Sequence, residues 1–170
     1  MKKESLTRFI EKYNLNGNIN SVILSCKDNK LNTRFITDDK TLLGELTMDN
    51  FKFEDSEFGI YSTDQLQKLI SVLGSDINLT LNKADEKAYA IKMKDENVFI
   101  DYMLSDTNVI NKAPNLKQIP DMDIKIKVNK KFTDTFIKGK NALADVDSFT
   151  VISDDNKVEL VIGYSAINTN

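Results

Sequence analysis

The sequence predicts an α+β fold in which one unit, a short helix followed by an antiparallel β-meander, occurs three times. The unit is expected at residues 6–48, at residues 66–104 and from residue 132 to the end of the chain. Each time, apolar residues first recur at helical spacing and then alternate with polar residues, with Val, Ile, Thr and Phe prominent. Repeats of this length are typical of supersecondary units that bury their apolar faces against one another.

Apolar stripes predict the three helices. Side chains at i, i+3, i+4 and i+7 share one helical face, and two copies fill all four positions: Leu6, Phe9, Ile10 and Tyr13, then Leu66, Leu69, Ile70 and Leu73. In the third copy Phe132, Phe136 and Leu143 share a stripe, but Thr135 and Gly139 occupy its other two positions.

The helix ends carry local signals. Gly17 is expected to stop the first helix. Ser62 with Gln65 forms a capping box for the second helix, and Gly74 follows its last apolar position. Asn129 is a good N-cap residue for the third.

The first two helices have matched stripes, which need a common surface. We therefore expect residues 4–14 and 62–74 to form helices that lie side by side. They should run antiparallel, or nearly so, on one face of a curved antiparallel sheet.

A hairpin follows each helix. Turns rich in Asp, Asn and Lys separate paired β-type segments at residues 27–30, 83–87 and 154–156. A further strand at residues 124–128 is expected to lead into the third helix, as residues 57–61 lead into the second.

A connector is predicted at residues 105–121, where the apolar residues follow neither the helical spacing nor the alternation of a strand. It contains both prolines, Pro114 and Pro120. We expect a first domain at residues 1–113 and a second at residues 114–170. Because two units precede the connector and about one and a half follow it, the second domain is expected to be incomplete at its C-terminus.

Composition limits the functions that are compatible with this chain. It has 170 residues, a net charge of −3, no histidine and one cysteine, Cys26, which ends an apolar strand. An internal disulfide or a thiolate zinc site is therefore excluded, and a small buried side chain is expected. No apolar run approaches the roughly 20 residues of a membrane span, and the first residues, MKKESL, contain no apolar stretch of signal-peptide length, so we expect a soluble cytosolic protein without a membrane partner.

Catalysis finds little support. The acidic clusters lie in predicted turns, where carboxylates are usually solvated, and no glycine-rich phosphate loop is present. The clusters are Asp38 and Asp39, then Glu54, Asp55 and Glu57, then Asp154 and Asp155. We expect no enzyme activity, no cofactor and no metal ion.

Basic residues project from the helices on the side opposite the apolar stripes. They are Arg8 and Lys12 on the first helix, Lys68 on the second, and Lys130, Lys131 and Lys138 on the third. An ordinary solvated surface and a nucleic-acid-facing surface both fit this pattern. Asp64 and Asp134 on the same faces favour the first interpretation.

The complete pattern resembles the DNA sliding clamps, and specifically the DNA polymerase processivity factor of T-even-type bacteriophages. The resemblance is strongest at residues 58–81, FGIYSTDQLQKLISVLGSDINLTL, and at residues 110–170 across the connector. It rests on paired helix-plus-meander units, a proline-containing connector, an acidic total charge and lysines on helices.

The resemblance implies a DNA-clamp fold with two similar domains per subunit, of which the second is C-terminally truncated here. It also implies a homotrimeric ring whose helices surround duplex DNA without reading its sequence. The DNA-contacting role then falls on Arg8, Lys12, Lys68, Lys130, Lys131 and Lys138, while Val72 departs from the basic pattern. The implied partners are the replicative polymerase and a clamp loader ATPase, in viral DNA replication in the host cytoplasm.

Subunits of this family join through edge strands, which completes open hydrogen-bond ladders. The resemblance implies that the first-domain edge is formed by Val98, Phe99, Ile100, Asp101, Tyr102 and Met103. Its partner strand would begin around Ser165. We therefore expect residues 1–170 to behave as a monomer or an irregular aggregate, with Val158, Leu160 and Ile162 partly exposed, and the full-length chain to form a closed trimer.

Two other classes of protein remain open. A β-rich phage structural or adaptor protein without DNA contact would share the meanders but would not need lysines opposite the core. A single-strand nucleic-acid binder should interleave aromatic and basic residues on a strand face, and Phe99 and Tyr102 have few lysines near them.

Overall fold

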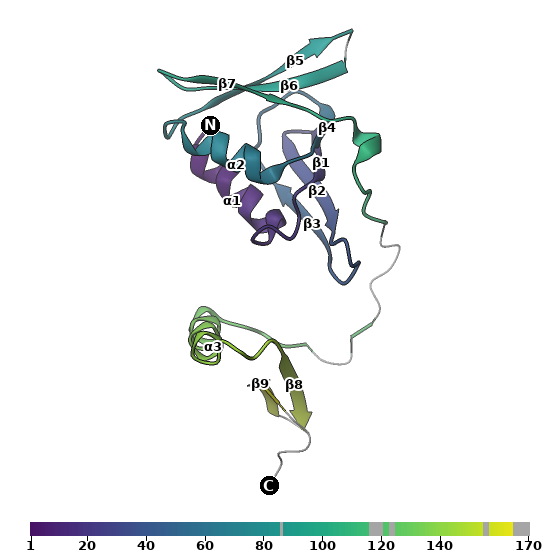
Figure 1. The fold of residues 1–170 in the computed structure, drawn as a ribbon. Helices are drawn as coiled ribbons and strands as arrows, with labels where there is room; N and C mark the ends of the chain where they lie inside the picture. Colours follow the sequence, from purple (N-terminus) through teal and green to yellow (C-terminus); the bar gives the residue numbers. More distant parts are fainter. Residues whose placement is uncertain (86, 116–120, 123–124, 155–156, 165–170) are drawn as a thin grey trace. The chain divides into compact units, whose positions relative to one another are not determined.

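The computed structural model describes residues 1–85, 87–115, 121–122, 125–154 and 157–164 (Figure 1). The chain divides into two compact units, Met1–Asn115 and Leu116–Asn170.

The first unit alternates single helices with runs of strands. Its elements are α1 (Lys3–Asn14), β1 (Val22–Lys27), β2 (Lys30–Ile36), β3 (Leu43–Met48), β4 (Ser56–Ile60), α2 (Thr63–Ser71), β5 (Asn78–Ala84), β6 (Lys87–Lys94), β7 (Phe99–Met103) and the short 3₁₀ helix η1 (Thr107–Val109). The helix-plus-meander repeat and the first two hairpins are thereby confirmed.

The strands of the first unit form two antiparallel sheets. One has the order β3-β2-β1-β4 and the other the order β5-β6-β7. The expectation of a single sheet was wrong, because the strands of this unit are divided between two sheets. An isolated bridge between Gly59 of β4 and Ser105, just after β7, links them. Gly59 makes this contact possible, since a Cβ atom there would lie 2.7 Å from the Ser105 carbonyl oxygen.

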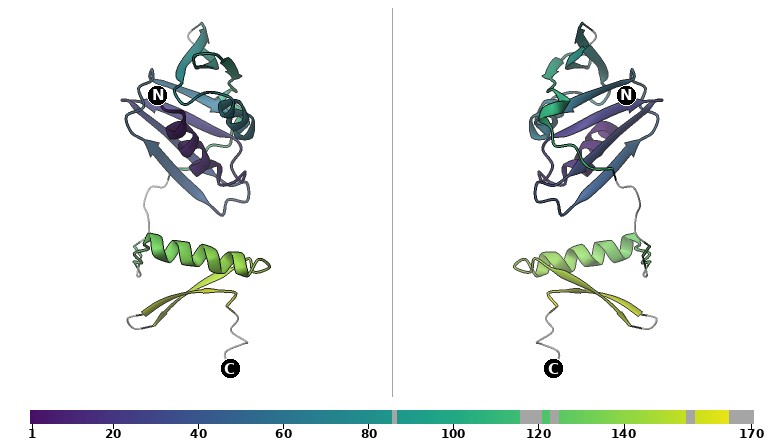
Figure 2. Two further views of the ribbon diagram at one scale, coloured as in Figure 1. Left: turned by 90° about the vertical axis from the view of Figure 1, so that its left-hand side faces the viewer. Right: turned by 90° about the vertical axis from the view of Figure 1, so that its right-hand side faces the viewer.

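Helices α1 and α2 lie side by side and run antiparallel, as predicted (Figures 1 and 2). At the start of α1 the Lys3 amide donates to the Ser75 carbonyl, just beyond the end of α2, at 2.8 Å. At the other end the hydroxyls of Tyr13 and Thr63 are 3.3 Å apart. The cap of α2 is also confirmed, because the Gln65 amide donates to the Ser62 Oγ atom at 3.3 Å.

A buried asparagine shapes the end of α1. The helix stops at Asn14, and the left-handed residues Leu15, Asn16 and Gly17 follow. The Asn14 side chain accepts from the Gly17 amide at 2.8 Å and donates to the Ile19 carbonyl at 2.9 Å. The predicted stop at Gly17 is thus part of a local turn that the side chain of Asn14 holds.

The predicted apolar stripes form the core of the first unit. Its buried helical residues are Leu6, Phe9, Ile10, Tyr13, Leu66 and Ile70, whereas Leu69 is half-buried. Leu73, just after the end of α2, is buried as well. Cys26 is buried among them as expected, and burial raises the pKa of its thiol to about 12. A thiol with this pKa is almost entirely protonated at neutral pH and is a poor nucleophile.

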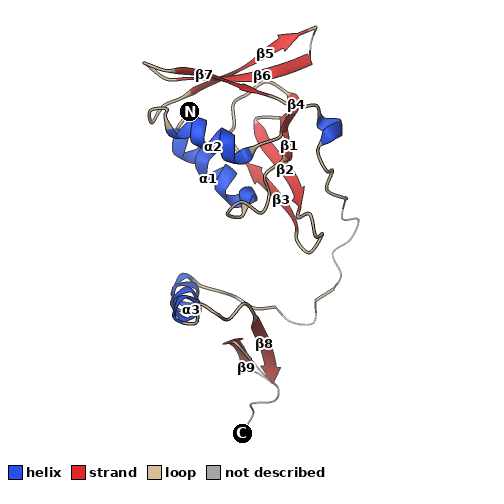
Figure 3. Cartoon of the chain, in the orientation of Figure 1, coloured by secondary structure: helices blue, strands red, loops and turns tan. Residues whose placement is uncertain are grey.

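The second unit contains α3 (Lys130–Ala142) and the antiparallel hairpin of β8 (Phe149–Asp154) and β9 (Lys157–Ile162) (Figure 3). Phe136 contacts Phe149 edge-on, with ring centroids 5.5 Å apart. Gly139 allows α3 to approach the hairpin, since a Cβ atom there would lie 3.2 Å from Ile162 Cδ1.

The core of the second unit is thin. None of its described residues is fully buried, and Val158 is 42% exposed, while Leu160 and Ile162 are half-buried. The strand expected at residues 124–128 was wrong for residues 125–128, which are not in a strand, and Ile124 lies outside the described residues. A strand requires a hydrogen-bonded partner, and the described hairpin pairs only with itself.

Candidate nucleic-acid interface

The outward face of α1 carries both signs of charge. Arg8 and Lys12 are exposed, on the side of the helix opposite the buried Leu6 and Ile10. The Arg8 guanidinium lies 2.8 Å from the Glu4 carboxylate one turn earlier. Arg8 is therefore exposed but already paired.

Helix α2 presents a single exposed cation on the corresponding face. Lys68 is exposed, and so is Asp64, one turn earlier. One turn later Val72 leaves an apolar side chain 63% exposed to solvent. The outward face of this helix therefore provides little net charge.

Helix α3 provides a denser cluster of cations. Lys130, Lys131 and Lys138 are all exposed. The Asn129 side chain accepts from the Phe132 amide at 2.9 Å, which confirms the predicted cap and fixes the start of the helix at Lys130. Asp134 lies between the lysines and is also exposed.

The proposed subunit-contact segment includes an edge strand. β7 is at the end of the three-stranded sheet, next to β6. Phe99 is 69% exposed and Met103 is 64% exposed, while Ile100 is half-buried. Asp101 accepts from the Asn82 side chain at 3.2 Å. Two large apolar side chains on an unpaired edge are unusual for a strand that faces only water.

Two of the six residues assigned to that segment have other roles in the fold. Tyr102 is buried, and its hydroxyl accepts from the Ser62 amide at 3.1 Å and donates to the Ser62 carbonyl at 3.0 Å. Val98 precedes β7, and its amide donates to the Asp95 carboxylate at 2.7 Å. Only the backbone of Tyr102 is therefore available to a neighbouring strand.

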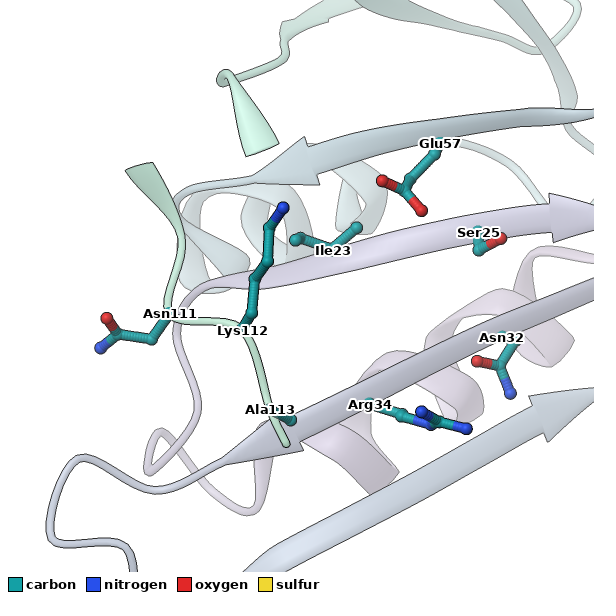
Figure 4. Close-up of a pocket in the computed structure, with 8 residues that line it drawn as sticks. All are labelled: Ile23, Ser25, Asn32, Arg34, Glu57, Asn111, Lys112 and Ala113. Carbon is teal, nitrogen blue, oxygen red and sulfur yellow. The ribbon is translucent and has the colours of Figure 1, made fainter. Parts of the chain in front are cut away.

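A polar pocket of about 340 Å³ lies between residues 111–113 and the outer face of β1, β2 and β4 (Figure 4). The side chains of Arg34, Lys112 and Glu57 border it. Arg34 Nε is 3.2 Å from the Glu45 carboxylate, and its guanidinium also donates to Asn115. Sequence analysis missed this pocket. The alternating polar residues of β2 were a signal for an exposed face, but nothing local indicates that residues 111–113 cross it.

The carboxylate of Asp39 has a structural role in its own turn. Asp39 accepts from the Thr37 hydroxyl at 2.6 Å and from the Thr41 amide at 3.0 Å, and these hydrogen bonds lower the pKa of its carboxyl. Within the part of the chain that the structure describes, no group of three or more His, Cys, Asp or Glu side chains could hold a metal ion. No described helix is long and apolar enough to cross a membrane.

Antiparallel helices beside antiparallel sheets, in repeated helix-plus-meander units, form the fold of the DNA sliding clamps. The proliferating cellular nuclear antigen (PCNA) of Entamoeba histolytica is similar with a TM-score of 0.63 and 16% identity, over 94% of this chain and 65% of that one. A. fulgidus PCNA with the C-terminal region of FEN-1 bound gives a TM-score of 0.61 and 14% identity, over 95% and 69%. The DNA polymerase III subunit beta of Pseudomonas aeruginosa gives 0.51 and 14%, over 72% and 33%.

This chain therefore has the clamp fold and spans 65% of the length of the Entamoeba protein. No protein-family model matches it. No curated protein matches it either.

Proposed function

We propose that this protein is a sliding clamp that encircles duplex DNA and tethers the replicative DNA polymerase. In this proposal it is a bacteriophage protein without enzyme activity, and it acts in viral DNA replication in the cytoplasm of the host cell. The observation that carries the proposal is the clamp fold, which extends over 94% of the chain in the comparison with Entamoeba PCNA.

In this proposal duplex DNA contacts the outward faces of the helices. The contact residues are Arg8, Lys12, Lys68, Lys130, Lys131 and Lys138, all of which are exposed. Cations on helices neutralise phosphates without reading base edges. A contact surface of this kind supports binding to any sequence, which a protein that slides along DNA requires.

Ring closure in this proposal uses strand pairing between subunits. The exposed Phe99 and Met103 on the edge strand β7 support an interface there. The assembly is a homotrimer of the full-length protein, and a clamp loader ATPase places it on DNA. An edge strand that gains a partner satisfies its open backbone groups and covers these apolar side chains.

The DNA-contacting role can be tested by charge reversal in the intact ring. Arg8→Glu together with Lys138→Glu should shorten retention on DNA and reduce polymerase processivity, and the difference from the parent should narrow as salt is added, because salt screens the contacts that the variant lacks. Exposed substitutions of this kind change stability by about 0.5 kcal/mol or less each. Lys27→Glu with Lys52→Glu, which are exposed outside the helices, is a control with the same change in net charge. Normal processivity of the folded double variant at physiological salt would reject the role.

A β-rich phage structural or adaptor protein without DNA contact is the alternative. It predicts that neither double variant changes any interaction with DNA, because the parent protein has none. Retention of the parent protein on duplex DNA in the same assay separates the two functions.

A further inference from the structure

The three helices place different charges at equivalent outward positions. Residues four apart lie nearly above one another on a helix, and each helix has such a column opposite its apolar stripe. The columns are Glu4, Arg8 and Lys12 in α1, Asp64 and Lys68 in α2 with Val72 at its C-cap, and Lys130, Asp134 and Lys138 in α3.

The outward faces of α1 and α2 are close to electrically neutral. In α1 the charges of Arg8 and Lys12 are balanced by Glu4 and the exposed Glu11. The Arg8 guanidinium and the Glu4 carboxylate are 2.8 Å apart, so these two charges cancel each other within one helical turn. In α2 Lys68 is balanced by Asp64, and the next position is Val72.

The outward face of α3 keeps a net charge of +2. Lys130, Lys131 and Lys138 contribute three positive charges and Asp134 one negative charge. Among the described residues, none of these lysines forms an ion pair, and neither do Lys12 and Lys68, whereas Arg8 does. The helices therefore differ mainly in the net charge of their outward faces. Lys125 and Lys127, just before the helix, are exposed as well.

We propose that Lys130, Lys131 and Lys138, the α3 basic surface, form the principal phosphate-contacting surface of this chain. The outward faces of α1 and α2 contribute little to binding. The ligand class is the phosphodiester backbone of duplex DNA, and in this respect the inference rests on the proposed function. It goes beyond that function because it assigns unequal roles to helices that the repeat makes equivalent.

The physical reason is the release of counterions. Each phosphate that a cation neutralises adds about 0.9 to the slope of log affinity against log salt concentration. A lysine ammonium group without an ion-pair partner keeps this contribution when it contacts a phosphate. Arg8 must give up its contact with Glu4 or bring that carboxylate close to a phosphate, which offsets the gain. Lys68 likewise brings Asp64 toward the DNA and is the only cation on its face. Asp134 has the same effect in α3 but offsets only one of three lysines.

Two triple variants with equal charge test the proposal. One is Lys130→Gln, Lys131→Gln and Lys138→Gln; the other is Arg8→Gln, Lys12→Gln and Lys68→Gln. Each takes the net charge from −3 to −3 − 3 = −6, and glutamine keeps a high helix propensity. Binding of a short fluorescently labelled duplex to the 170-residue chain is followed by anisotropy between about 50 and 200 mM NaCl. Circular dichroism checks that both variants are folded.

The α3 variant should lose about 2 to 3 units of salt slope and at least tenfold in affinity at about 100 mM NaCl. The variant in α1 and α2 should lose less than about one unit. Equal losses, or a larger loss from α1 and α2, would overturn the inference and leave the proposed function intact. A parent chain that shows no salt-dependent binding would also overturn the inference. The proposed function is decided separately, by retention of the intact ring on DNA.

Discussion

Glu4 controls how much charge α1 can offer to a polyanion, because its carboxylate is 2.8 Å from the Arg8 guanidinium. Both side chains are more than 70% exposed, so the pair itself contributes only a few tenths of a kcal/mol to stability. Its effect on binding is larger than its effect on folding, since the carboxylate repels phosphates as well as occupying the arginine.

Glu4→Gln should therefore raise the affinity for a short duplex about two- to threefold at low salt, with a steeper salt dependence. The same anisotropy titration measures it. Glu96→Gln, an exposed position in the turn between β6 and β7, changes the net charge identically and should have a smaller effect. Equal effects of the two variants would mean that Glu4 acts only through the net charge.

Asp95 organises the turn that leads into β7. Its carboxylate accepts from the amides of Gly74 at 2.6 Å and of Asn97 and Val98 at 2.7 Å. These hydrogen bonds lower the pKa of the carboxyl. A carboxyl with a lowered pKa in the folded state stabilises the protein above its unfolded pKa of about 3.9. That contribution is lost as the pH falls through the folded pKa.

Asp95→Asn should thus lower the melting temperature at pH 7, and the difference from the parent should shrink below about pH 4. Thermal unfolding followed by circular dichroism at both pH values measures the difference. Glu96→Gln in the same turn is the control. A difference that stays constant between pH 7 and pH 3 would show that the ionised carboxylate is not responsible.

At the scale of elements, the hydroxyl of Tyr102 links β7 to the start of α2. It bonds both the amide and the carbonyl of Ser62, the N-cap residue of that helix. Burial raises the pKa of the Tyr102 hydroxyl, so it remains a neutral donor and acceptor at physiological pH.

Tyr102→Phe should destabilise the first unit by about 1–2 kcal/mol, because the Ser62 backbone loses its partner in a partly buried position. Urea unfolding measures the loss as a shift in midpoint with an unchanged slope. Tyr89→Phe, at a side chain 44% exposed, should have almost no effect. If the two variants unfold at the same urea concentration, the link between Tyr102 and Ser62 does not contribute to stability.

Local signals made most of the elements predictable. The apolar stripes and the caps at Ser62 and Asn129 act within one or two turns of a helix, and the hairpin turns act between adjacent segments. The ion pair between Glu4 and Arg8 was also accessible from its i, i+4 spacing.

Non-local contacts account for what sequence analysis missed or got wrong. The strand expected at residues 124–128 had the right alternation, but residues 125–128 pair with none of the strands that the structure describes. The bridge that brings Ser105 against Gly59 joins residues that are 46 apart by their numbers. The pocket beside Arg34 depends on the path of residues 111–113 over a sheet formed much earlier in the chain.

At the scale of the whole molecule, an acidic protein and a DNA-contacting function are compatible if the positive charge is concentrated. The net charge is −3, yet the outward face of α3 keeps +2. Repulsion between the rest of the surface and phosphates would discourage binding in other orientations. A sliding clamp is held on DNA mainly by the closed ring around the duplex, and weak sequence-independent contacts contribute less. Encirclement of the duplex is therefore the central claim.

Threading onto DNA tests that claim most directly. The full-length protein is incubated with a linear duplex that has cohesive ends, and the ends are then ligated to give a circle. The complex is passed through a sizing column at about 0.5 M NaCl, because this salt concentration screens contacts with phosphates. The account predicts that the protein elutes with the circle and is released when one restriction enzyme cuts it. Release from circle and linear duplex alike would contradict encirclement.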